Sequence, residues 1–234
     1  MAREKRILAT VYVDVETVPT QRQDVAQRIA DKHKPVFDSS IDISDPKQAK
    51  KWAETQNKAL EDSIEGYRKT SLDGTFGELV CISWAIDDAP ITSSYRSLAG
   101  PETPVLSAFT FAMDDLADRV GADNIMYVAH NADFDRLFLT KRMTIHRLYG
   151  PPGLAPRGEK PWDLQWQCTM RTWCDTPQGR ISLADLALAL SLPVGKDDLP
   201  GSEVYDAMLR GEHERVRQHC ERDVDLVRQV WARL

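Results

Sequence analysis

A short apolar strand that ends in two carboxylates constrains the fold of this chain most. Residues 6–15 alternate between apolar and polar side chains and are rich in β-branched residues, which is typical of a strand in a sheet core. Asp14 and Glu16 close this segment, and residues two apart on a strand point to the same face. We therefore expect both carboxylates to project together, where they would repel each other unless a cation lay between them.

The rest of the chain alternates between strand and helix patterns, which indicates an α/β domain. Residues 78–86 and 125–129 are apolar runs of strand length, and residues 91–98 follow a turn, as in a hairpin. Apolar spacing and cap signals predict helices over residues 47–67, 104–120, 132–139, 183–190, 202–210 and 212–234. Residues 149–161 have the composition of a loop, whereas residues 162–173 favour neither a helix nor a strand.

Residues 20–71 differ from the rest because they are polar and contain few apolar side chains. Pro46 stands where a helix over residues 47–67 would begin, which suits the first turn of a helix. We interpret residues 20–71 as a helical insertion between the first two strands, so that residues 1–234 form a single domain.

The composition is ordinary for a soluble enzyme and does not suit a protein that coats DNA by charge alone. The formal net charge is −6, so Lys and Arg are not in excess for neutralising phosphates. The sequence has no apolar run long enough to span a bilayer. Its four cysteines show neither CxxC pairing nor zinc spacing, which favours reduced thiols. We expect a cytoplasmic protein that does not enter a membrane.

Two further motifs place acidic residues beside apolar elements. Asp135 follows Asn131 and Phe134 at the start of a predicted helix, directly after a short apolar strand. His219 and Asp223 lie four residues apart on the last predicted helix, so they share one face. Asp223 borders the apolar stripe of that helix, which places it to face a cleft beside the core.

In this order the three motifs resemble those of the DEDD family of 3′→5′ exonucleases, the DnaQ-like branch of the ribonuclease H-like fold. The family pattern is DxE, then Asn-x-x-aromatic-Asp, then a final Tyr or His before Asp. Residues 72–80, 182–186 and 195–204 also look like segments of phage-type members, whereas residues 20–71 resemble the family least. The last motif has the three-residue spacing of the tyrosine branch, but His219 occupies the tyrosine position.

The resemblance implies a mixed five-stranded sheet flanked by helices and a magnesium-dependent exonuclease. It also implies that Asp14 bridges two Mg²⁺ ions roughly 3.5–4 Å apart, with Glu16 and Asp223 on one ion and Asp135 supporting the other. Mn²⁺ is expected to substitute for Mg²⁺. We interpret His219 as a general base or a water-orienting residue, since histidine titrates near neutrality.

Contacts with the substrate are expected from residues close to these motifs in sequence. The candidates are Thr17, Asn131, Phe134 and Lys196. Other possible phosphate contacts are Lys141, Arg142, Arg147, Arg157 and Lys160. Trp162, Trp166 and Trp173 are suited to stacking on bases, although core packing is the better interpretation for at least two of them.

The expected substrate is the 3′ end of DNA, most simply single-stranded, from which nucleoside monophosphates are released. We expect a stand-alone enzyme, with a separate replication or repair protein as a possible partner. Two alternatives fit the same sequence: an exoribonuclease of the same fold, and an inactive module that binds nucleic acid. The presence of all four acids counts against the inactive module, because clustered charges are costly without a cation.

Overall fold

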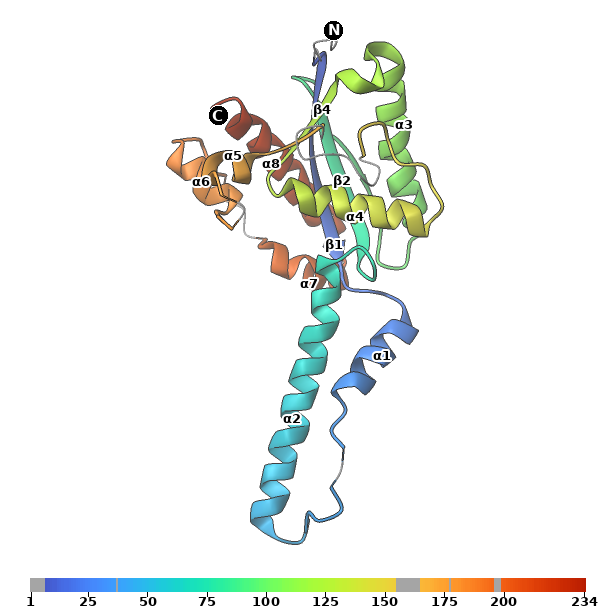
Figure 1. Ribbon diagram of the computed structural model, residues 1–234, viewed down its shortest axis with the longest axis vertical. Helices are drawn as coiled ribbons and strands as arrows, with labels where there is room; N and C mark the ends of the chain where they lie inside the picture. Colours follow the sequence, from blue (N-terminus) through green and yellow to red (C-terminus); the bar gives the residue numbers. More distant parts are fainter. Residues whose placement is uncertain (1–6, 37, 155–164, 177, 196–198) are drawn as a thin grey trace. The chain divides into compact units, whose positions relative to one another are not determined.

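The computed structural model describes residues 7–36, 38–154, 165–176, 178–195 and 199–234. Within them a sheet of five strands has the order β3-β2-β1-β4-β5 (Figure 1). Its strands are β1 (Ala9–Val18), β2 (Glu78–Ile86), β3 (Thr92–Tyr95), β4 (Ile125–Ala129) and β5 (Trp166–Cys168). The sheet is mixed, because β1 and β5 each run parallel to β4 whereas β2 and β3 are antiparallel.

Helices flank this sheet, as Figure 1 shows. They are α3 (Thr103–Val120), α4 (Ala132–Ile145), α5 (Thr169–Cys174), α6 (Leu183–Ala189), α7 (Val204–Leu209) and α8 (His213–Trp231). The predicted fold class, a mixed five-stranded sheet flanked by helices in a ribonuclease H-like arrangement, is confirmed. None of the helices among the described residues is both long enough and apolar enough to cross a membrane.

The hydrophobic core forms between the sheet and the helices α3 and α4. Val11 and Val13 of β1 are fully buried there, together with Phe109 of α3 and Leu139 of α4. Because side chains alternate along a strand, the even-numbered residues of β1 face the other side of the sheet. Helix α8 lies on that side, where the Cys220 thiol contacts the backbone of Asp14. Strand β1 therefore supplies the core on one face and polar groups on the other.

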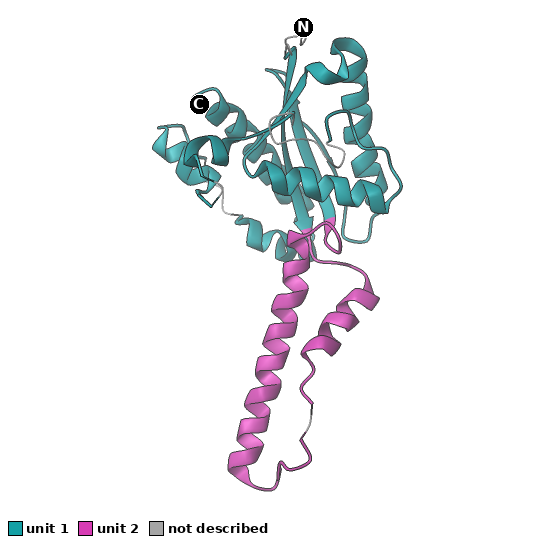
Figure 2. Ribbon diagram, in the orientation of Figure 1, with its two compact units in different colours: residues 1–17, 79–234 teal, residues 18–78 magenta. Residues whose placement is uncertain are grey.

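Residues Val18–Glu78 form a second compact unit, shown in magenta in Figure 2. It contains α1 (Gln23–His33) and α2 (Pro46–Arg68), which pack against each other, and a short 3₁₀ helix, Lys69–Leu72. The side chain of Asp45 caps α2 by accepting a hydrogen bond from the backbone N–H of Lys47. Along the chain, this unit lies between β1 and β2.

Three local differences separate the structure from the sequence interpretation. Helix α1 was not predicted, because Val25 is its one buried residue and provides almost no apolar pattern. The strand expected over residues 91–98 is limited to β3. Strand β5 and helix α5 occupy the part of residues 162–173 that is described, where the sequence favoured neither element.

Candidate metal centre

Strand β1 presents Asp14 and Glu16 on the face opposite its core-packed valines. Val13 and Val15 are buried in the core, so the carboxylates on either side of Val15 point toward α8. Glu16 is only 7% exposed, and Asp14 is partly buried. One carboxylate oxygen from each residue and the sulfur of Cys220 all lie within 4.8 Å of one another. The two acids therefore converge as their spacing predicted.

Helix α8 brings three groups to the same place. The Nε2 atom of His219 lies 3.3 Å from a carboxylate oxygen of Glu16, and both side chains are almost completely buried. Cys220 donates its S–H to the backbone carbonyl of Asp14 across 3.4 Å. Asp223 lies one helical turn after His219 and is close enough to Asp14 to raise the pKa of that carboxyl group.

Helix α4 supplies the remaining carboxylate. The helix begins directly after β4, and Asp135 lies in its first turn with only 4% of its surface exposed. The backbone N–H of Val15 on β1 lies close enough to the Asp135 carboxyl group to act on its pKa. This proximity places Asp135 beside the strand that carries Asp14 and Glu16.

Burial and neighbouring negative charges raise the pKa values of two of these acids. Burial raises the pKa of Asp14 well above its ordinary value, and the charges of Glu16, Asp223 and Asp135 raise it further. Burial also raises the pKa of Asp135 to about 7, although its backbone hydrogen bonds oppose the shift. Both carboxyl groups would ionise more readily beside a cation.

The donor set fits a hard divalent cation. Carboxylate oxygens are the ligands that Mg²⁺ and Mn²⁺ prefer, and clustered carboxylates gain most from a cation that cancels their repulsion. The neighbouring sulfur of Cys220 is fully buried, and burial raises the pKa of this thiol. Cys220 therefore contributes a neutral thiol beside the oxygen ligands.

Comparison with solved structures gives one informative likeness. The chain is similar to the family B DNA polymerase from the hyperthermophilic archaeon Pyrobaculum calidifontis, with a TM-score of 0.56 and 11% sequence identity. The match covers 96% of this chain and 24% of the polymerase chain, so the protein spans about a quarter of that length. This likeness is one of fold. No protein-family model and no curated protein matches the sequence.

The residues expected to contact substrate have different surroundings. Thr17 is partly buried next to Glu16 at the end of β1, and Asn131 is exposed before α4, where its side chain makes no capping hydrogen bond. Phe134 packs on Phe138, with ring centroids 5.6 Å apart, and leans on the hydrophobic core. Lys196 lies outside the described residues.

One of the other basic candidates, Arg142, is buried and does not suit a phosphate contact. Arg142 is 7% exposed and forms an ion pair with Glu102, which also contacts His146 across 2.8 Å. Its prediction as a phosphate contact is therefore wrong, since its guanidinium already neutralises a buried carboxylate. Arg157 and Lys160 lie outside the described residues.

The tryptophans differ in the same way. Trp166 is buried and stacks on Tyr127 with centroids 4.9 Å apart, so it belongs to the core, as we expected for some of these residues. Trp173 on α5 is 44% exposed and remains available for stacking. Trp162 lies outside the described residues.

Two features of the site were not predicted from the sequence. Cys220 lies in the apolar stripe of the last helix, and such spacing does not distinguish a packed sulfur from one beside carboxylates. Asp133, in the first turn of α4, pairs with Arg171 of α5. His130 further links this region to α5 through a 2.8 Å hydrogen bond with Thr169.

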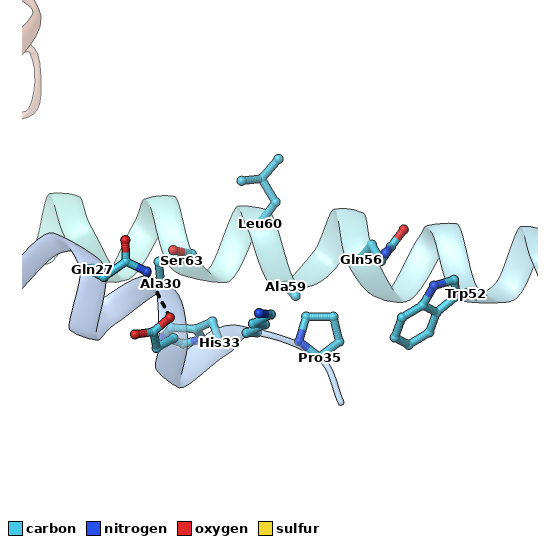
Figure 3. Close-up of a pocket in the computed structure, with 11 residues that line it drawn as sticks. Gln27, Ala30, His33, Pro35, Trp52, Gln56, Ala59, Leu60 and Ser63 are labelled. Atoms are coloured by element: carbon cyan, nitrogen blue, oxygen red, sulfur yellow. Dashed lines mark hydrogen bonds between the residues drawn. The ribbon is translucent and has the colours of Figure 1, made fainter. Parts of the chain in front are cut away.

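A separate hollow lies within the second unit, between α1 and α2. Figure 3 shows Pro35 and Trp52 along its side, and the pocket has a volume of about 510 Å³. A 2.9 Å hydrogen bond joins Gln27 to Asp31 at one end. Its lining includes none of the four acids of the candidate metal centre.

Proposed function

We propose that this protein is a Mg²⁺-dependent 3′→5′ exonuclease that hydrolyses the terminal phosphodiester bond of DNA and releases nucleoside monophosphates. The observation that carries the proposal is the convergence of four acids, drawn from β1, α4 and α8, with a histidine against one of them. Burial raises the pKa values of Asp14 and Asp135, and the charges of neighbouring carboxylates raise them further, which supports a role in holding cations. The likeness in fold to part of a DNA polymerase agrees with a nucleic-acid substrate.

Asp14, Glu16, Asp135 and Asp223 would hold two Mg²⁺ ions. When bound, such ions neutralise charge on the phosphate and on the departing oxygen, and they make an attacking water more acidic. Asp14 and Glu16 would bind from β1, and Asp223 would close the site from α8. Asp135 would bind from α4, where its carboxyl group lies near the backbone N–H of Val15 on β1.

His219 is the proposed acceptor of the proton from the attacking water. A carboxylate only accepts hydrogen bonds, so the contact with Glu16 is made by a protonated Nε2. A neutral ring then has Nδ1 as its basic nitrogen, and Nδ1 would take the proton. As the water oxygen bonds to phosphorus, the bond from phosphorus to the 3′ oxygen breaks, and that oxygen leaves with a proton from solvent.

The test is digestion of oligonucleotides that carry a label at the 5′ end. We expect single-stranded DNA to shorten one nucleotide at a time with Mg²⁺ or Mn²⁺, and to stay intact with EDTA. Labelled RNA and duplex DNA are run alongside, and faster loss of RNA would assign an exoribonuclease instead. Intact substrates with every cation, at an enzyme excess, would contradict a nuclease and favour a binding module.

A further inference from the structure

A chain of polar side chains crosses the α8 side of the sheet behind the candidate metal centre. Ser83 of β2 and Ser93 of β3 are directly paired across the strands, and their hydroxyl oxygens lie 2.9 Å apart. Ser93 donates to the carboxylate of Glu221 on α8 across 2.6 Å. Ser83 is fully buried, and Glu221 also pairs with Arg217. Buried hydroxyls in a sheet are costly unless they are bonded, so this chain connects α8 to two strands.

The direction of the chain follows from which groups can donate. A carboxylate only accepts, so the single hydroxyl proton of Ser93 goes to Glu221. Ser83 must then donate its own proton to the oxygen of Ser93. Every hydroxyl in the chain therefore has one fixed orientation, which ends on α8.

A second connection runs from the neighbouring residue of α8. Cys220 donates to the backbone carbonyl of Asp14 on β1, and the Cys81 thiol of β2 lies close enough to raise the pKa of the Cys220 thiol further. Cys81 in turn lies 3.8 Å from the hydroxyl of Ser83. Cys220 and Glu221 thus connect one turn of α8 to β1, β2 and β3 through a continuous set of buried and partly buried contacts.

We propose that this set, which we call the α8 anchor (Cys81, Ser83, Ser93, Cys220 and Glu221), positions His219 and Asp223 against Asp14 and Glu16. Cys220 and Glu221 lie between His219 and Asp223 in the sequence, and because an α-helix has 3.6 residues per turn, those two side chains are one turn apart on the same face of α8. A small rotation or slide of α8 would therefore move both groups relative to β1. The anchor members are positioning residues, and this inference rests on the proposed function.

The test is Ser93→Ala, which removes the hydroxyl between Ser83 and Glu221. Ser93→Thr restores a hydroxyl and suits a strand, so it should rescue the effect. Ser94→Ala is the matched control, because Ser94 is the next residue on β3 and points to the opposite face of the sheet. Glu221→Gln is a second variant of the anchor, which keeps the shape of the side chain but loses its charge.

Two properties are measured on the full chain: Mn²⁺ affinity from the electron paramagnetic resonance signal of free Mn²⁺, and kcat and KM on single-stranded DNA. We expect Ser93→Ala and Glu221→Gln each to weaken Mn²⁺ binding and lower kcat by about tenfold or more, the scale on which groups that support metal ligands act. KM for DNA should stay the same. Ser93→Thr and Ser94→Ala should match the natural protein.

The outcomes separate this inference from the function on which it rests. If the natural protein binds Mn²⁺ and cleaves DNA while Ser93→Ala and Glu221→Gln do so equally well, the positioning role is wrong and the function stands. If the natural protein neither binds Mn²⁺ nor cleaves a nucleic acid, both proposals fail. If Ser93→Ala lowers the unfolding temperature but leaves the Mn²⁺ affinity unchanged, the anchor is purely structural. That result would also overturn the inference.

Discussion

Asp14 and Asp135 hold their protons more tightly than ordinary carboxyl groups, because both are buried near other acids. Raised pKa values of this kind are expected of metal-ligating carboxyl groups in the absence of the metal, and they differ from that of a structural carboxylate such as Glu102. Glu102 is as deeply buried as Asp135, but its pKa is lowered: burial acts to raise it, and the hydrogen bonds and charge of Arg142 outweigh that effect. The two kinds of acid therefore differ in whether a cationic side chain, such as that of Arg142, neutralises the carboxylate.

We predict that the metal-free protein loses stability as pH rises from about 4 to about 7. Asp135 has a pKa of about 7 in the folded chain and an ordinary value of 3.8 when unfolded, so the folded state binds the proton more tightly. This contribution is complete below about pH 4 and is lost as pH rises through about 7. Unfolding temperatures in EDTA should therefore depend on pH more strongly in the natural protein than in Asp135→Asn. Equal pH dependence in both would contradict the raised pKa.

Asp14→Asn should reduce DNA cleavage by more than about a hundredfold, beyond the loss typical of groups that only support metal ligands. In EDTA the variant should be at least as stable as the natural protein, because a buried charge surrounded by other acids has been removed. The loss of activity is measured by cleavage of labelled DNA, and the stability is measured by thermal unfolding without metal. Natural activity in the variant would remove Asp14 from the site.

His219→Gln should lower kcat by roughly 10²- to 10⁴-fold, the usual contribution of a general base. A base must be unprotonated to act, so the rate of the natural protein should rise with pH, and this rise should vanish in the variant. The pH profile of kcat checks this result, with His213→Gln on the same helix as the control. A lower rate with an unchanged profile would leave His219 as a residue that orients water.

Helix α8 and strand β1 could be predicted well because each carries a long, regular pattern. The valines of β1 repeat every second residue, and the apolar residues of α8 repeat at helical spacing, so the positions of the acids between them followed directly. Helix α1 and strand β5 lack such patterns. The first buries only Val25, and the second has three residues, so tertiary packing decides their structure.

A buried ion pair that was not predicted from the sequence joins the N-cap residue of α3 to α4. Glu102 and Arg142 are 40 residues apart, and their side chains are 3% and 8% exposed. We predict that Arg142→Ala lowers the free energy of unfolding by about 3–5 kcal/mol, because it leaves a buried carboxylate without its cation. Urea unfolding checks this value. Arg119→Ala, which removes an exposed pair with Asp115, should change it by less than about 1 kcal/mol.

The fold class was predictable from sequence, whereas the network that surrounds the acids was not. Acids at the ends of regular elements can be located from periodicity alone. The contacts from Cys220 to Asp14 and from Ser93 to Glu221 join residues more than a hundred positions apart, and nothing local marks them. For the same reason Arg142 looked like a surface cation, although Glu102 neutralises it.

We expect divalent cations to stabilise the folded protein as a whole. A ligand that binds only the folded state adds stability that grows with its concentration, about 2.7 kcal/mol at 100 times its Kd. We therefore expect Mn²⁺ and Mg²⁺ to raise the unfolding temperature of the natural protein but not that of Asp14→Asn. Thermal unfolding with increasing Mn²⁺ measures the effect. No shift in the natural protein would argue against a metal centre.

The different surroundings of the two faces of β1 fix the register of this strand. Val11, Val13 and Val15 pack into the hydrophobic core, whereas Asp14 and Glu16 on the other face form part of the acidic group. Inserting or deleting a single residue between Ala9 and Val13 would exchange the two sets, pushing carboxylates into hydrocarbon and valines toward α8. Length changes in this segment should therefore be far less tolerated than substitutions, since one such change would damage folding and chemistry together.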